Sequence, residues 1–201
     1  MKFSIAVLLV TVAAFSAFAE KKTVYSQEFD QKYSGAGAYK EKGFAGDLVF
    51  SAQDGRTKPG TIGIKTAEDS GLGKGMSIYI PAIPLDLKKS YVCRIFVKKQ
   101  EKIYGGSIKL TIRPRDEGKK WIWKAKPFTR IIKIAKLKDG EWHEFKFEFM
   151  PRPDDAEWEK GKFFAVLYTV ANAKGQTVWF DDFEVVENEI PAQPSHGNVK
   201  N

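Results

Sequence analysis

The sequence predicts an all-β protein, folded as an antiparallel sandwich or barrel. Apolar residues recur every second position in several short segments, which is typical of strands with one buried face. The segments between them are rich in Gly, Asp and Pro, as in "QDGRTKPG" and "KDGEW". No long segment has the 3.6-residue period of an amphipathic helix, so helices are not expected to form a layer of the fold.

The first clearly patterned strands show this alternation. In residues 76–80 ("MSIYI"), Tyr79 points away from the face that the apolar residues share. In residues 91–97 ("YVCRIFV"), Arg94 and Phe96 lie on the face opposite the cysteine. Both segments are therefore predicted to be strands that present some side chains to solvent.

Later segments repeat the pattern. Residues 107–113 ("SIKLTIR") place Lys109 and Arg113 outward, and residues 143–149 ("HEFKFEF") place three phenylalanines on one face. Two further strands are expected in "KFFAVLY" and "TVWFDDFEVV". The segment "DDAEWEKG" is predicted to hold no more than one short turn of helix.

The two ends of the chain are expected to lie outside the folded domain. Residues 1–19 have a basic start, an apolar run and a small-residue "AFA" cleavage motif, which are the features of a secretory signal peptide. The domain is then predicted over residues 20–187, with a disordered tail over residues 188–201 that is polar and holds two prolines. The mature protein is expected to be secreted or periplasmic, without membrane insertion.

Charge and cysteine content restrict the partners and the chemistry. The chain carries a formal charge of +8, which falls to +7 when Lys2 is removed with the leader. A basic exported protein favours anionic partners, although lysines scattered over a solvated surface would give the same number. Cys93 is the only cysteine, so it cannot form an intramolecular disulfide, and its apolar segment predicts a buried thiol.

Four segments, taken in order, resemble a known family. They are "SQEFD", "IPLDLKKSYVCRIFVKK", "DGEWHEFKFEF" and "QTVWFDDFEVVE", spread over most of residues 24–187. Together they resemble the β-jelly-roll carbohydrate-binding modules grouped around families 4, 9 and 22, within the galactose-binding-like superfamily. The resemblance implies two packed antiparallel sheets, with a glycan held on the concave sheet or at the loop rim.

The same resemblance implies a structural calcium ion near the chain termini. In such modules the first and last strands pair, which would gather Glu28, Asp30, Asp181 and Asp182. Carboxylates are among the oxygen ligands that calcium uses. The alternative is that Asp181 and Asp182 are ordinary surface acids at the end of a strand.

Two tryptophans are the first candidates for a ligand surface. In "GKKWIWKAKPF", residues 118–128, Trp121 and Trp123 are two positions apart and would share one face of an extended strand. A pyranose ring can lie on such an aromatic face. The alternative is that one or both pack between the sheets. Trp142 and Trp179 are expected in the core, and Trp158 is assigned to neither class.

Outward strand positions supply the remaining candidates. Tyr79 and Phe96 would extend the aromatic floor, while Arg94 and Arg113 would orient the ligand. Arginine can bind a carboxylate or sulfate with two parallel hydrogen bonds, so a surface of this kind would suit a uronic or sulfated glycan. This prediction requires the side chains to converge on one surface.

The sequence thus predicts an exported, non-catalytic protein that binds a poly- or oligosaccharide. A cell-envelope structural or protein-interaction domain is the first alternative, and a polysaccharide-active enzyme is the second. No short motif for nucleophilic or metal-dependent hydrolysis occurs in the sequence. Aromatic and basic residues are interleaved as in single-strand binders, but export argues against a nucleic-acid partner. The oligomeric state is left open.

Overall fold

The computed structural model describes residues 21–30, 36–68, 73–100, 105–152 and 154–189. The predicted leader, residues 1–19, lies outside these ranges, as does the tail from residue 190 onward. The last strand continues to Glu189, two residues past the predicted end of the domain at position 187.

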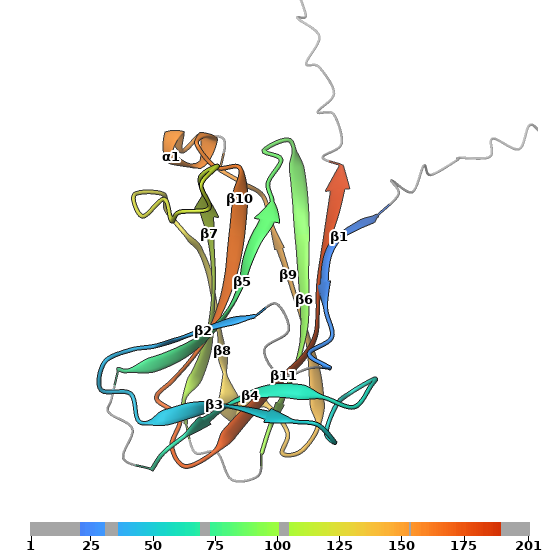
Figure 1. The fold of residues 1–201 in the computed structure, drawn as a ribbon, viewed down its shortest axis with the longest axis vertical. Helices are drawn as coiled ribbons and strands as arrows, with labels where there is room; N and C mark the ends of the chain where they lie inside the picture. Colours follow the sequence, from blue (N-terminus) through green and yellow to red (C-terminus); the bar gives the residue numbers. More distant parts are fainter. Residues whose placement is uncertain (1–20, 31–35, 69–72, 101–104, 153, 190–201) are drawn as a thin grey trace, which may run out of the picture.

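Two antiparallel sheets pack face to face, which confirms the predicted jelly-roll sandwich (Figure 1). Sheet A has the strand order β3-β4-β11-β6-β9, with β1 paired to β11. Its strands are β1 (Lys22–Gln27), β3 (Gly46–Ser51), β4 (Thr61–Thr66), β6 (Lys89–Lys99), β9 (Trp142–Phe149) and β11 (Thr177–Glu189).

Sheet B has the strand order β2-β5-β10-β7-β8. Its strands are β2 (Gly37–Lys40), β5 (Gly75–Pro84), β7 (Ser107–Arg115), β8 (Phe128–Lys133) and β10 (Phe163–Ala171). The two sheets are linked by chain crossovers, because neighbouring strands within each sheet are mostly distant in sequence.

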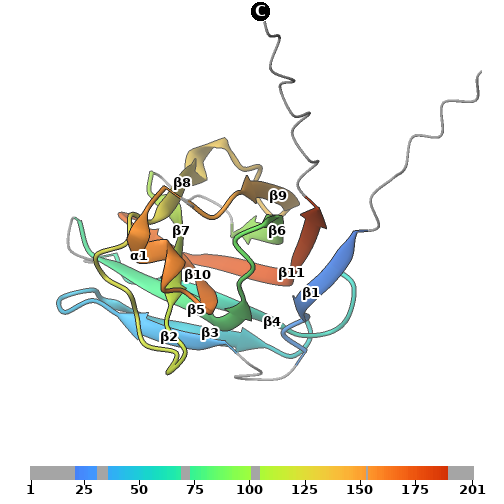
Figure 2. The same ribbon diagram turned by 90° about the horizontal axis from the view of Figure 1, so that it is seen from above.

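The first and last strands pair, as the resemblance implied. β1 lies antiparallel beside the second half of β11, with Gln27 opposite Phe183 (Figure 2). The other side of β11 pairs with β6 along most of its length. This pairing brings the segment after β1 close to the middle of β11, where the four predicted calcium ligands lie.

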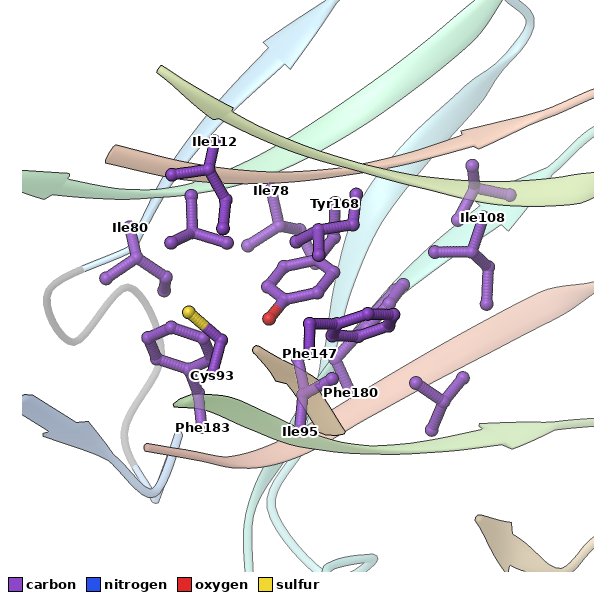
Figure 3. Packing of buried hydrophobic residues seen from close by; sticks show 14 of the residues in the cluster. Ile78, Ile80, Cys93, Ile95, Ile108, Ile112, Phe147, Tyr168, Phe180 and Phe183 are labelled. Carbon is purple, nitrogen blue, oxygen red and sulfur yellow. The ribbon is translucent and has the colours of Figure 1, made fainter. Parts of the chain in front are cut away.

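The inward side chains of both sheets form one hydrophobic core (Figure 3). Cys93 is buried there, as expected, and burial raises the pKa of its thiol. Tyr168 packs edge-on against Phe183, with its hydroxyl buried and without a hydrogen-bond partner among the described residues. Because the Cys93 thiol is buried and its pKa is raised, it is not a reactive group of a surface site.

Helical structure is limited to two short turns, α1 (Ala156–Glu159) and the 3₁₀ turn η1 (Ile134–Lys136). Asp155 caps α1 by accepting a hydrogen bond from the Glu157 amide. Trp158, left open by the sequence, is fully buried. Among the described residues, no helix has the length and apolar character needed to cross a membrane.

Candidate functional site

The outer face of sheet B carries a continuous set of aromatic and basic side chains. Because residues paired across antiparallel strands point the same way, Tyr79, Leu167 and Thr111 form one outward row. The next row contains Tyr39, Ser77, Thr169, Lys109 and Ile131. We call the surface made by these rows, together with Arg113, Arg115, Phe163, Trp121 and Trp123, the sheet B face.

The two tryptophans lie at one end of this face, in the β7–β8 loop near α1 (Figure 1). Trp121 forms an isolated bridge with Arg115, and the chain then turns instead of continuing as a strand. The two indole rings still lie together, with centroids 5.6 Å apart and planes inclined by 35°. Trp123 is 71% exposed, so it is a surface residue and not part of the core.

Two arginines hold this pair in place. Arg113 donates from Nη1 to the main-chain oxygens of Trp123 and Ala125, at 2.9 and 2.8 Å. Its guanidinium carbon lies 5.3 Å from the Trp123 ring centroid, and that of Arg115 lies 4.9 Å from the Trp121 ring. Partial burial lowers the pKa of Arg113 from its ordinary value.

The loop is also tied to the buried end of the sandwich. The Trp158 indole donates to the main-chain oxygen of Lys126, and the Asp155 carboxylate accepts from the Lys126 amide. The hydrogen bonds that the Asp155 carboxylate accepts from the Lys126 and Glu157 amides hold the pKa of Asp155 below its ordinary value. The exposed tryptophan surface is thus carried on a fixed loop, which limits the entropy lost when a ligand binds.

The strands of sheet B contain basic residues and no Asp or Glu at all. The basic residues are Lys40, Lys109, Arg113, Arg115, Arg130 and Lys133. Among the described residues, no ion pair involves Lys109, Arg113 or Arg115. The sheet B face therefore keeps its positive charge available for a ligand.

Several members of this face were not identified from the sequence. Tyr39 is 59% exposed and Ile131 is 61% exposed, although both lie in strands that the alternation did not reveal. Phe163 was hidden in "KFFAVLY", where two adjacent phenylalanines point to opposite faces. If Phe164 had been placed in the core, Phe163 would have been predicted to point outward, because adjacent residues of a strand point to opposite faces.

The structure does not bring Phe96 and Arg94 to the sheet B face. Both lie on β6, on the outer side of sheet A. Phe96 is only 9% exposed, because the Arg56 guanidinium covers its ring at 3.6 Å. Arg94 pairs with Glu184 and Glu144, so its charge is already neutralised. Of the six predicted ligand residues, four share one surface and two lie on the opposite sheet.

The four predicted calcium ligands do lie near one another, around the loop that follows β3. Glu28 accepts a hydrogen bond from Lys58 Nζ at 2.6 Å, and Asp182 pairs with Arg56 Nε at 2.7 Å. Asp30 and Asp182 both contribute to the raised pKa of Lys58, after the larger effect of Glu28. Two cations therefore lie among the acids where the resemblance implied a metal.

Asp181 is buried and is held by main-chain amides. Its carboxylate accepts from the Arg56 amide at 2.7 Å and from the Asp182 amide at 2.9 Å. Desolvation outweighs these hydrogen bonds and raises the pKa of Asp181 to about 6. Among the described residues, no group of three or more Asp, Glu, His or Cys side chains has the arrangement of a metal site. In this arrangement the acids do not fit a calcium centre.

Trp142 and Trp179 are not in the core, contrary to expectation. Val178 and Phe180 point into the sandwich, so Trp179 points outward between them. Trp142 lies in the same outward row as Lys98 and Trp179, with Lys98 Nζ 4.8 Å from its ring centroid. Both tryptophans are half-buried on the outer side of sheet A.

Comparison with solved structures identifies the class of fold. The xylan-binding family 22 module of Xyn10C from Paenibacillus barcinonensis superposes with a TM-score of 0.55 at 12% identity, covering 87% of this chain and 99% of that one. A family 11 carbohydrate-binding module from Clostridium thermocellum, solved with a mixed-linked tetrasaccharide, gives 0.54 at 11% identity, covering 82% and 94%.

A third similar structure has a different setting. The enzymatically active domain of tailspike protein 4 from bacteriophage CBA120 gives a TM-score of 0.55 at 9% identity, covering 81% of this chain and 20% of that one. No family model matches the sequence. No curated protein matches it either. The chain thus has the β-sandwich fold of carbohydrate-binding modules, and at these identities the likeness establishes the fold alone.

Proposed function

We propose that the protein is an exported, non-catalytic carbohydrate-binding protein whose sheet B face binds an acidic poly- or oligosaccharide. The observation that supports this most directly is the composition of that face. It combines exposed aromatic rings with unpaired basic groups on strands without any carboxylate. Aromatic rings and cations together match a sugar ring that carries a negative charge.

The geometry suits a ligand several sugar units long. Tyr79 on β5 and Arg113 on β7 are separated by two strand spacings and by two residues along the strand, or roughly 12 Å. Trp123 lies beyond Arg113 and extends the surface further. A sugar ring stacked on Trp123 would place its carboxylate or sulfate near the guanidinium of Arg113 or Arg115. Lys109 would contact the next charged unit along the chain.

The absence of catalysis is part of the proposal. Hydrolysis of glycosidic bonds commonly uses two carboxylates across the bound sugar. The sheet B strands supply none. The β7–β8 loop contains Asp116 and Glu117, and the Asp116 carboxylate accepts a hydrogen bond from the Lys120 amide. Export follows from the leader predicted over residues 1–19, and it would place the protein with extracellular or periplasmic polysaccharides.

Affinity electrophoresis of residues 20–201 tests the proposal. The gel would contain neutral or acidic polysaccharides at low and high salt, with single-stranded DNA as a control. Retardation by one acidic polysaccharide that persists at high salt supports specific recognition. Retardation by every polyanion that disappears at high salt would show non-specific charge attraction only. No retardation at all would favour a protein-interaction role.

A further inference from the structure

A cavity lies on the outer side of sheet A, away from the sheet B face. It has a volume of about 650 Å³, within the range of small-molecule sites. Its lining comes from the ends of β6 and β11, the turn before β11, the loop before β9 and the loop after β3. The lining residues are Asp54, Lys98, Lys99, Gln100, Gly140, Gly175, Gln176 and Trp179.

Trp179 provides an aromatic wall on a rigid base. Its ring lies against β4 at Gly63, where an added Cβ would come within 2.6 Å of the indole. Gly63 therefore allows the indole to lie flat on the sheet, with one ring face supported by the backbone. The half-buried ring keeps part of its surface toward the cavity that it lines. A flat aromatic surface held in this way suits the C–H face of a sugar.

Gln176 is fixed at its backbone and has an unused side-chain acceptor. Its main-chain oxygen accepts from the Thr66 amide and hydroxyl, at 2.8 and 3.1 Å. Its side-chain oxygen Oε1 is buried and has no hydrogen-bond partner among the described residues. A buried polar atom without a partner is costly, so rotation of the Gln176 side chain toward the cavity, where a ligand hydroxyl could donate to Oε1, would be favoured.

The charges that line the cavity nearly cancel. Lys99 is buried, and its ammonium group lies 2.6 Å from Asp139, which neutralises it. The remaining ammonium group, on Lys98, is offset by the carboxylate of Asp54 in the same lining. A carboxylate, an amide and an ammonium group together can both accept and donate hydrogen bonds, as sugar hydroxyls require.

We propose that this cavity is a second saccharide site, which binds a neutral sugar unit stacked on Trp179 and hydrogen-bonded through Gln176 and Asp54. An anionic sugar would be opposed by the Asp54 carboxylate and would gain no unpaired guanidinium. The site is independent of the sheet B face, because the two lie on opposite sheets. If no neutral sugar binds in this cavity, the proposal that the sheet B face binds an acidic glycan is unaffected.

Isothermal titration calorimetry with neutral trisaccharides tests the site, using xylotriose, cellotriose and mannotriose as probes. We expect at least one to bind, with heat that is insensitive to salt. Gln176→Ala should weaken that binding by about tenfold, the cost of one lost hydrogen bond to a buried group. Trp179→Ala should abolish it. Trp179 also packs on β4, so Trp179→Ala could fail to fold. In that case the Gln176→Ala result alone tests the proposal.

Trp123→Ala is the matched control, since it removes a tryptophan from the sheet B face. It should leave trisaccharide binding unchanged, and Gln176→Ala should leave retardation by acidic polysaccharide unchanged. Binding of none of the three probes would overturn the proposal. An equal loss in Trp123→Ala would also overturn it, because the sugar would then occupy the other sheet.

Discussion

The outer faces of the two sheets contain similar residues in different electrostatic settings. Each face has two tryptophans beside basic side chains. Sheet A supplies acids as well, with Asp47, Glu144, Glu148, Asp182, Glu184 and Glu187 in its strands. Its Arg94 and Lys99 are paired to carboxylates, and Arg56 from the loop after β3 is paired to Asp182. Sheet B supplies no strand acid.

This difference shows that the residue types alone do not define a ligand surface. Arg94 and Arg113 occupy similar outward positions in the sequence pattern, but within the described part of the chain Arg94 has acidic partners and Arg113 has none. A paired guanidinium contributes to the packing and charge balance of its own sheet. An unpaired one beside an exposed ring can still contribute to binding.

Removing one tryptophan from each face should separate their roles most strongly. Trp123→Ala is expected to weaken acidic-glycan binding by about ten- to a hundredfold, because an exposed stacking surface is lost. Its melting temperature should stay close to that of the parent protein, since the ring covers little of the core. Trp142→Ala on sheet A should leave glycan binding intact. If affinity electrophoresis showed the same loss of binding for Trp123→Ala and Trp142→Ala, the two faces would not differ in their role in acidic-glycan binding.

The buried acid of sheet A should make stability depend on pH. Burial raises the pKa of Asp181 to about 6, so its protonated form is favoured in the folded state. The resulting stabilisation is complete below the unfolded-state pKa of about 4, and it is lost as the pH rises through about 6. Relative to Asp181→Asn, the parent protein should lose on the order of 2 kcal/mol over that interval.

Urea unfolding of the two proteins at several pH values measures this difference. The substitution also removes one acceptor for the Arg56 or Asp182 amide, so the test is the change of the difference with pH and not its value at a single pH. A constant difference in the free energy of unfolding between pH 4 and 7 would mean that Asp181 is not raised in pKa.

Removing one positive charge from each sheet should give a smaller effect on binding. Lys109→Gln is expected to weaken acidic-glycan binding severalfold and to reduce its salt dependence, because Lys109 lies exposed among neutral neighbours. Lys65→Gln on sheet A, where Asp47 lies opposite in register, is the matched control and should not change binding. Similar losses in both variants would indicate attraction by net charge.

Removal of divalent metal ions by a chelator should have the smallest effect, and that effect would be on the melting temperature. Arg56 and Lys58 already pair with Asp182 and Glu28, so the melting temperature should be the same with and without EDTA. A fall in melting temperature on chelation, restored by calcium, would show that a metal displaces these cations, in line with the family resemblance.

The sequence predicted the fold because its period of two extends through most of the long strands. It missed β2, β3, β4 and β8, and in two of them, "GAYK" and "FTRIIK", apolar and polar residues do not alternate. Alternation could not have placed Trp179, because a register shift between Asp181 and Glu184 brings Phe180 and Phe183, which stand an odd number of residues apart, to the same buried face. The resemblance to a hydrophobic scaffold led instead to a wrong prediction.

The candidate site could be predicted only in part, for a reason of topology. Alternation correctly assigned Tyr79, Arg94 and Phe96 to outward positions, but it does not tell which sheet a strand joins. β5 and β6 are consecutive in sequence and belong to different sheets. Only the three-dimensional strand order separates Phe96 from Trp123.

The position of β11 has a consequence for how the chain folds. This last strand lies inside sheet A, between β6 on one side and β4 and β1 on the other. Sheet A therefore cannot close before the end of the domain has been synthesised, and its contacts have high contact order. Folding of sheet A should therefore follow completion of the domain, rather than proceed strand by strand as the chain is synthesised.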